Sequence, residues 1–272
     1  MEKRILHRIA LTVAYRGLNY WGWQRQQTGP SVQQYLEKAL SAVANEAVEV
    51  FVSGRTDRGV HATAQVVHFD VSTTRPLSAW IRGGNSLLPS DIRVLSAQCV
   101  SDQFHARHSA QWRTYQYFLW QKPVMAPWAY DGWAHHPHAL DVDAMQQAAT
   151  YCIGEHDFSA FRAAMCQSHS THRCIRSMQI HPNRYGLDIT ITGNAFLHHM
   201  VRNMTGSLIW VGSGKRSPSW MKELLASGDR TLAGPTAPAK GLWLIGIDFG
   251  SIGNGLGKKE MPYDWLEREC NE

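Results

Sequence analysis

The alternation of hydrophobic and polar positions in the first part of the chain predicts a strand, a helix, two strands, a helix and a strand. Residues 8–15 alternate as a strand does, with the apolar side chains on one face. Residues 31–45 carry an apolar residue every three to four positions, and Ser31 with Gln34 fits a capping box at a helix start. The other expected elements here are strands at 48–53, 65–71 and 92–100 and a glycine-weakened helix at 76–89.

The same order of elements restarts in the second half of the chain. The expected elements are strands at 112–120, 175–181, 187–193 and 241–249 and helices at 141–154, 196–212 and 217–228. Strand, helix, strand, strand, helix, strand is the ferredoxin-like, split βαβ order. We therefore predict an α+β fold of two duplicated halves, residues 1–105 and 106–250. Two such halves could join their sheets side by side and leave a central cleft between them. The tail, 251–272, is expected to be poorly ordered.

Composition indicates an ordered globular protein with a weak preference for anionic partners. Of 272 residues, 44% are hydrophobic and 18% charged, and 27 Lys plus Arg outnumber 22 Asp plus Glu. The five cysteines form no CxxC pair, which argues against a disulfide scaffold. The N-terminus has no long apolar segment, and no stretch is long and apolar enough to span a bilayer. We expect a reduced, cytoplasmic protein with no membrane association.

A single carboxylate stands out in the stretch FVSGRTDRGVHA, residues 51–62. Asp57 lies between Arg55 and Arg58, and glycines bracket the three residues. An aspartate in a glycine-rich turn often only satisfies turn amides. Alternatively, the stretch is a strand-loop-strand unit that presents a positioned carboxylate, which the guanidinium groups hold ionised and orient. These residues alone leave both interpretations open.

Two segments of the second half add candidate polar chemistry. Tyr115 and Tyr117 share one face of an expected strand, and either could be core or could stack on a base. His198 and Arg202 are four positions apart in the expected helix at 196–212, so they should share a face. An arginine in such an apolar helix needs a carboxylate partner, and Asp57 is a candidate.

The histidine-rich stretches raise the possibility of a metal site. The stretches at 135–138 and 166–174 contain possible ligands, but their spacing matches no common zinc template. No phosphate-binding glycine motif is present. We therefore expect no metal and no cofactor. A histidine-rich metallohydrolase and a non-catalytic RNA-binding module, suggested by the aromatic and basic residues at 15–26, remain alternatives.

Taken in order, seven short motifs resemble the tRNA pseudouridine synthase A family. They are YRGLNYWGWQ, GRTDRGVHA, FHARHSA, RTYQY, GEHDFSAFR, AFLHHMVRN and GLWL, and the resemblance covers residues 8–249. It implies an isomerase that converts uridine to pseudouridine at positions 38 to 40, in the anticodon stem-loop of tRNA, without a cofactor. It also implies a homodimer and a duplicated α+β fold, in which the halves form one extended antiparallel sheet with helices on one face.

The resemblance implies a role for each matching residue. Asp57 would be the nucleophile, Tyr115 would contact the target base, and Arg202 would be the basic partner of the carboxylate. Arg75 would act in base flipping. The implied RNA contacts are Phe104, His105, Ala106, Arg107, His108, Met165, Cys166, Gln167, Ser168 and His169. Arg55 and Arg58, the two cations beside Asp57, are further candidates for substrate binding. Two positions depart from the family pattern, because Arg16 stands where relatives commonly have Asp and Arg58 where they commonly have Ala.

Overall fold

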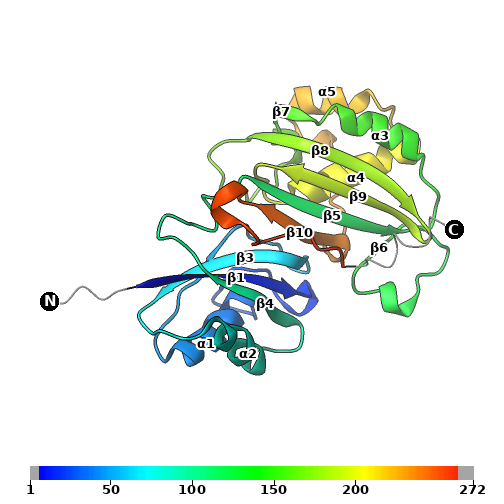
Figure 1. Ribbon diagram of the computed structural model, residues 1–272. Coiled ribbons are helices and arrows are strands. Elements are labelled where there is room, and N and C mark those ends of the chain that lie inside the picture. The colour runs from blue at the N-terminus through cyan, green and yellow to red at the C-terminus, as the bar shows by residue number, and fades with distance from the viewer. Residues whose placement is uncertain (1–5, 263–272) are drawn as a thin grey trace. The chain divides into compact units, whose positions relative to one another are not determined.

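The computed structural model describes residues 6–262, and their contacts divide the chain into two α+β units (Figure 1). The first unit comprises the described residues up to Gln111 together with Leu244–Pro262, and the second comprises Trp112–Trp243. Five α-helices occur among the described residues, and the sheets are mostly antiparallel. The α+β class expected from the sequence is thus confirmed. None of the helices in residues 6–262 is both long and apolar enough to cross a bilayer.

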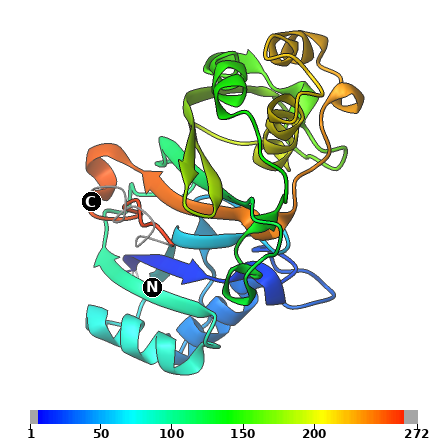
Figure 2. The ribbon, with the colours of Figure 1, turned by 90° about the vertical axis from the view of Figure 1, so that its right-hand side faces the viewer.

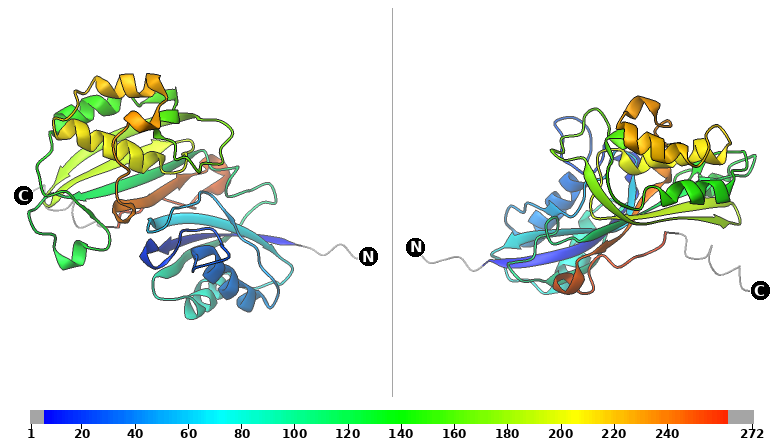
Figure 3. Two further views of the ribbon diagram at one scale, coloured as in Figure 1. Left: turned by 180° about the vertical axis from the view of Figure 1, so that it is seen from behind. Right: turned by 90° about the horizontal axis from the view of Figure 1, so that it is seen from above.

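Three long strands and two helices form the first unit. Strand β1 (His7–Tyr15) lies between β3 (His61–Val71) and β4 (Ile92–Cys99) and pairs with both antiparallel. The short β2 (Phe51–Val52) also pairs with β3, and β10 (Leu242–Asp248) follows β3 in the strand order. Helices α1 (Val32–Ala44) and α2 (Leu77–Leu87) lie on one face of this sheet (Figures 1 and 3).

Side chains of α1 decide where the second strand begins. Ser31 caps the helix, because its hydroxyl accepts a hydrogen bond from the Gln34 amide at 3.3 Å, so the predicted capping contact is confirmed. The amides of Val48 and Val50 then donate to side chains of α1, at 2.9 Å and 3.1 Å. These amides cannot also join a ladder, so the strand predicted at 48–53 is reduced to Phe51–Val52.

The second unit contains a run of four antiparallel strands with three helices on one face (Figures 2 and 3). Its strands follow the order β5 (Trp112–Trp120), β9 (Gly186–Gly193), β8 (His172–Asn183) and β7 (Gly154–Asp157). A two-residue strand, β6 (Ala134–His135), pairs with β5 in parallel. The helices are α3 (Val142–Thr150), α4 (Met200–Gly212) and α5 (Trp220–Ser227).

All three helices of this unit are shorter than predicted, and α3 and α4 show the clearest differences. Helix α3 ends at Thr150, and Gly154, with φ of 103°, begins β7 instead of ending the helix. Helix α4 begins only at Met200, because His199 is left-handed with φ of 62°. His198 therefore lies outside the helix, and the prediction that it shares a helical face with Arg202 is wrong. The predicted hairpin of β8 and β9 is confirmed.

Residues 251–262, the described part of the expected tail, are packed within the first unit. The Ile247 amide donates to the Gly257 carbonyl at 2.8 Å, and the Glu260 amide donates to the Ile245 carbonyl at 2.9 Å. The Thr63 hydroxyl on β3 donates to the Glu260 carbonyl at 2.6 Å. Residues 263–272 of the expected tail lie outside the described residues.

Candidate active site

Asp57 lies in the loop between β2 and β3, at the first position of a tight turn. The Val60 amide donates to the Asp57 carbonyl at 3.1 Å, and Gly59 has φ of 78°. A positive φ at the third position defines a type II turn, which explains the glycine. Asp57 is half-buried, whereas Arg55 and Arg58 are exposed on either side of it. The loop therefore offers one partly sheltered carboxylate between two exposed cations.

A buried polar network holds this loop from below. The hydroxyls of Tyr15 and Thr56 lie 2.8 Å apart. The Gln65 amide nitrogen donates to the Tyr15 hydroxyl at 3.2 Å and to the Gly54 carbonyl at 2.7 Å, while Ser53 donates to the Gln65 amide oxygen at 2.6 Å. The four side chains are buried, so the partners satisfy one another. The network fixes the loop on both sides of Arg55, next to Asp57.

Burial also sets the protonation state within the network. It raises the pKa of Tyr15 to about 12, against the smaller opposing effect of the hydrogen bonds from Thr56 and Gln65. Tyr15 is therefore a neutral hydroxyl at neutral pH. From the sequence, Tyr15 was expected only on the apolar face of the strand at 8–15, and this network was not predicted. The one signal in the sequence is a pair of polar residues, Thr56 within the GRTD motif and Gln65 in the strand that follows it.

The aromatic loop after β1 packs directly on the Asp57 loop. The Trp23 amide donates to the Thr56 carbonyl at 3.0 Å, and the Gly17 amide donates to His61 Nδ1 at 3.2 Å. A Cβ on Gly17 would lie 1.9 Å from the Val60 carbonyl oxygen. Only a glycine permits such an approach. The two loops therefore pack closely together, although the contacting residues lie more than thirty positions apart in the sequence.

Arg58, one of the two departures from the family pattern, contacts this aromatic loop. Its guanidinium carbon lies 4.8 Å from the centroid of the Trp21 ring, the geometry of a cation–π contact. The Trp21 side chain is 40% exposed, so the pair lies at the surface of the unit. At the other departure, the Arg16 amide donates to the Asp91 carbonyl at 2.9 Å.

Within the first unit, Arg75 and the segment 104–108 also contain implied RNA contacts. Arg75 is exposed between β3 and α2, and its Nε lies 3.3 Å from the Val43 carbonyl oxygen. Phe104 and Ala106 are fully buried, whereas Arg107 and His108 are exposed. Phe104 and Ala106 therefore anchor the segment, and only its other residues present side chains outward.

In the second unit, Arg202 is held against the segment before η5 (Ala239–Gly241). Its Nε donates to the Ala237 carbonyl at 2.8 Å, and the Ala237 amide donates back to the Arg202 carbonyl at 3.1 Å. The Tyr117 hydroxyl donates to the Pro238 carbonyl at 2.9 Å. Burial raises the pKa of Tyr117, and the charge of Arg202 opposes this rise, so the two side chains are neighbours. The pairing of Arg202 with Asp57 stays a prediction.

Tyr115 lies two positions before Tyr117 on β5. It pairs across the sheet with Ile191, its ring meets Phe196 edge-on at 5.1 Å, and the residue is 8% exposed. The strand thus places both tyrosines on the same face, as the alternation predicts. Their environments differ, because Tyr117 is fully buried and bonded to backbone.

The second implied RNA-binding segment, 165–169, is a surface loop with internal support. Arg162 donates to the Cys166 carbonyl at 2.6 Å, and Arg173 donates to the Ser168 hydroxyl at 2.6 Å. The His198 amide lies 3.5 Å from Cys166 Sγ. Burial raises the pKa of Cys166, but the amides of Ser168 and His198 and the Arg162 guanidinium outweigh it and lower the pKa overall. Met165, Gln167 and His169 are exposed.

The histidine-rich stretches do not gather metal ligands within the part of the chain that the structure describes. Neither 135–138 nor 166–174 brings three candidate ligand atoms together there. Instead, a ring nitrogen of His135 lies 2.9 Å from the Lys122 carbonyl oxygen, and the rings of His136 and His138 meet edge-on at 5.9 Å.

Comparison with known proteins assigns this arrangement to a class of RNA-modifying isomerases. The family model described as tRNA pseudouridine synthase matches residues 11–109 and 148–250, more than half of the chain. A solved structure, "Crystal Structure of a Cbf5-Nop10-Gar1 Complex", contains a chain with 9% identity and a TM-score of 0.33, covering 74% of this chain and 54% of that one. A likeness at that level adds nothing to the assignment.

Close relatives narrow the class to one family. The tRNA pseudouridine synthase A of Vibrio cholerae is 49% identical over 257 residues, covering 94% of this chain and 96% of that protein. Those of Vibrio campbellii and Aliivibrio fischeri are 51% and 48% identical, each covering 89% of this chain and 92% of the relative. The chain therefore belongs to the tRNA pseudouridine synthase A family and is an isomerase, as the motifs predicted.

Proposed function

We propose that the protein converts uridine to pseudouridine at positions 38 to 40 of tRNA, in the anticodon stem-loop, with Asp57 as the nucleophile. The observation that carries the proposal is the Asp57 loop itself. A half-buried carboxylate stands on a type II turn that is held by a buried network and by the aromatic loop beside it. Such preorganisation is what a positioned nucleophile requires.

The reaction needs a carboxylate but neither an oxidant nor a donated group. The N1–C1′ bond breaks, the uracil turns, and a C5–C1′ bond forms. C5 loses a proton to water and N1 gains one, so atoms and electrons balance. Attack of Asp57 at C1′, its attack at C6, and a route through deprotonation at C2′ all use the same carboxylate. No cofactor is required by any of the three routes.

The remaining roles follow the family pattern. Tyr115 contacts the target base, and Arg202 is the basic partner of Asp57. Arg75 assists base flipping, which costs a few kcal/mol of unstacking. RNA contacts are made by Arg55 and Arg58 and by the two segments 104–108 and 165–169, through the side chains that those segments expose.

At the level of assembly, we infer that the two halves form one extended sheet with a central cleft, and that the protein is a cytoplasmic homodimer. The support is the family assignment together with the two α+β units. Sedimentation at micromolar concentration tests the dimer. A single species near the monomer mass of 30.7 kDa, with or without tRNA, would contradict it.

Mapping of the modified nucleotide tests the function. Unmodified tRNA transcripts with uridine at positions 38 to 40 are incubated with the purified protein, treated with carbodiimide and mapped by primer extension. New stops at those positions alone are expected, and the activity should survive EDTA when the substrate is prefolded. Binding without any stop would favour an RNA-binding module. Activity lost in EDTA and restored only by zinc would favour a metalloenzyme.

A further inference from the structure

We propose that His68 is a positioning residue, which holds the backbone of segment 104–108 so that Arg107 and His108 meet the tRNA in one fixed arrangement. The inference rests on the proposed function, since it assigns a role within tRNA binding. His68 lies on β3 and is fully buried, so it does not contact RNA itself. Its effect must pass through the segment that covers it.

The first contact is a hydrogen bond to the centre of the segment. The Ala106 amide donates to His68 Nδ1 at 3.1 Å. Both partners are buried, so the bond is shielded from water. The side chain of Ala106 is a methyl group and cannot form a hydrogen bond, so this bond to the backbone amide holds the segment at that position. The His68 ring also stacks on Phe51 at 5.0 Å and meets the His105 ring at 4.6 Å, which fixes its orientation.

The second contact continues the same arrangement outward through His105. The amides of Arg107 and His108 donate to His105 Nδ1, at 3.1 Å and 3.4 Å. The His105 amide donates to the Ser109 hydroxyl at 3.0 Å, and the Ser109 amide donates back to the His105 carbonyl at 2.8 Å. Two ring nitrogens, on His68 and His105, thus accept bonds from three amides of one short segment. Both must be unprotonated to do so.

Electrostatics favour that neutral state at both rings. Burial, followed by the charges of His105 and Arg8, lowers the pKa of His68 to about 4, against a smaller opposing effect of Asp70. Burial and the neighbouring His108 likewise lower the pKa of His105. Both rings are therefore neutral acceptors at neutral pH.

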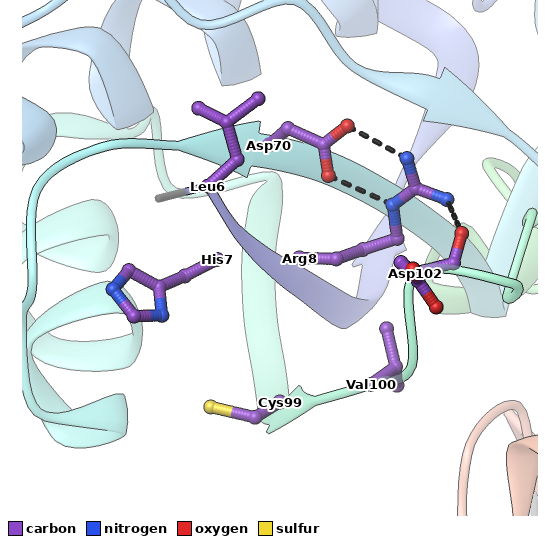
Figure 4. Close-up of a pocket in the computed structure, with 7 residues that line it drawn as sticks. All are labelled: Leu6, His7, Arg8, Asp70, Cys99, Val100 and Asp102. Carbon is purple, nitrogen blue, oxygen red and sulfur yellow. Dashed lines mark hydrogen bonds and ion pairs between the residues drawn. The ribbon is translucent and has the colours of Figure 1, made fainter. Parts of the chain in front are cut away.

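Arg8 fixes the start of the same segment (Figure 4). It forms a bidentate pair with Asp70, with both nitrogen–oxygen distances at 2.7 Å, and donates to the carbonyls of Asp102 and Phe104. Arg8, Asp70 and Asp102 border a cavity of about 310 Å³ at the start of β1. Arg8 faces Asp70 across the β1–β3 ladder, and His68 lies two positions before Asp70 on the same face of β3. One face of the sheet therefore holds the segment at two points.

Matched variants of His68 separate positioning from simple packing. His68→Asn keeps an acceptor bonded to Cγ, at the place of Nδ1, whereas His68→Gln moves its amide one bond outward. The two have the same chemistry and differ in the reach of the acceptor. Arg107→Ala supplies the background in which the positioned side chain is absent.

The measurement is tRNA affinity against salt concentration, with turnover at saturating tRNA as a second readout. We expect His68→Gln to weaken tRNA binding about tenfold and to lower the salt slope by about one unit, with little change in kcat. His68→Asn should bind as wild type does. In the Arg107→Ala background, His68→Gln should weaken binding much less than tenfold, because the two changes remove the same contact.

Three results would overturn the role of His68. The first is equal tRNA affinity of the His68→Asn and His68→Gln proteins. The second is a His68→Gln effect on affinity that is as large in the Arg107→Ala background as in the wild type. The third is a loss of kcat without a loss of tRNA affinity. If His68→Gln does not fold, the His68→Asn and Arg8→Lys proteins provide the test. Arg8→Lys loses the bidentate pair with Asp70 and should weaken tRNA binding, whereas His68→Asn should not. Failure of the proposed function is seen separately, as absence of pseudouridine in wild type while these binding comparisons still give a result.

Discussion

The approach of Gly17 to the Asp57 loop predicts that Gly17→Ala will move the candidate nucleophile. The new Cβ would lie 1.9 Å from the Val60 carbonyl oxygen, and real Cβ contacts stay beyond 3.0 Å, so the loops must separate by about 1 Å. Val60 closes the turn on Asp57 through its amide. A shift of that size at a catalytic group costs about 10²-fold in rate, which is about 2.7 kcal/mol in the barrier. Overpacking should also lower the free energy of unfolding by about 1–3 kcal/mol.

The assay is single-turnover pseudouridine formation at saturating tRNA, with urea denaturation in parallel. Gly84→Ala, within helix α2, is the matched control, because the new Cβ would meet only Val94 Cγ2, at an ordinary contact distance of 3.6 Å. The control should keep the wild-type rate. Its free energy of unfolding should rise by up to about 1 kcal/mol, because alanine has a higher helix propensity than glycine. A Gly17→Ala rate within threefold of wild type would show that the contact does not position Asp57.

Three further predictions concern the network, the buried imidazole and the RNA contacts. Tyr15→Phe should destabilise the protein by about 1–3 kcal/mol in urea, because it removes a buried hydroxyl between two polar partners. Between about pH 6.5 and 4, residue 68 binds a proton in the unfolded chain but stays neutral in the folded protein. The free energy of unfolding should therefore decrease as the pH is lowered through this range. This decrease in the free energy of unfolding should be up to about 3 kcal/mol larger in the wild type than in His68→Asn. Arg107→Ala should lower the salt slope of tRNA binding by about one unit. Arg75→Ala should reduce turnover more than it weakens tRNA binding. Arg82→Ala, at another exposed arginine, is the control and should change neither turnover nor binding.

Local periodicity predicted most of the fold. The strands at 8–15, 92–100 and 112–120 and the helix at 31–45 were predicted to within about one residue, because each has a regular pattern of apolar positions. Two of the errors fell where a single backbone conformation or a side-chain hydrogen bond limits an element. The left-handed His199 and the amides bonded to α1 are such cases. Neither produces a periodic signal.

The site was predicted less completely than the fold. The GRTD motif indicates Asp57, but Tyr15, Gly17 and Gln65, which support its loop, lie elsewhere in the sequence, as does His68, which supports segment 104–108. Tyr15 and Gln65 look like strand residues, Gly17 looks like a loop glycine, and His68 looks like one polar position in an alternating strand. Their roles depend on tertiary contacts, which no local pattern reports. The family resemblance identified residues by motif and so could not reveal these supporting contacts.

Tritium release from tRNA labelled at uridine C5 by the Asp57→Asn protein tests the nucleophile most directly. The variant keeps the size and hydrogen-bonding shape of the side chain but removes its charge and its nucleophilic oxygen. It should fold, bind tRNA and release no tritium above background, because the segments proposed to bind RNA are unchanged. Activity within tenfold of wild type would mean a barrier change below ~1.4 kcal/mol. That is too small for loss of a nucleophile, and it would contradict the role proposed for Asp57.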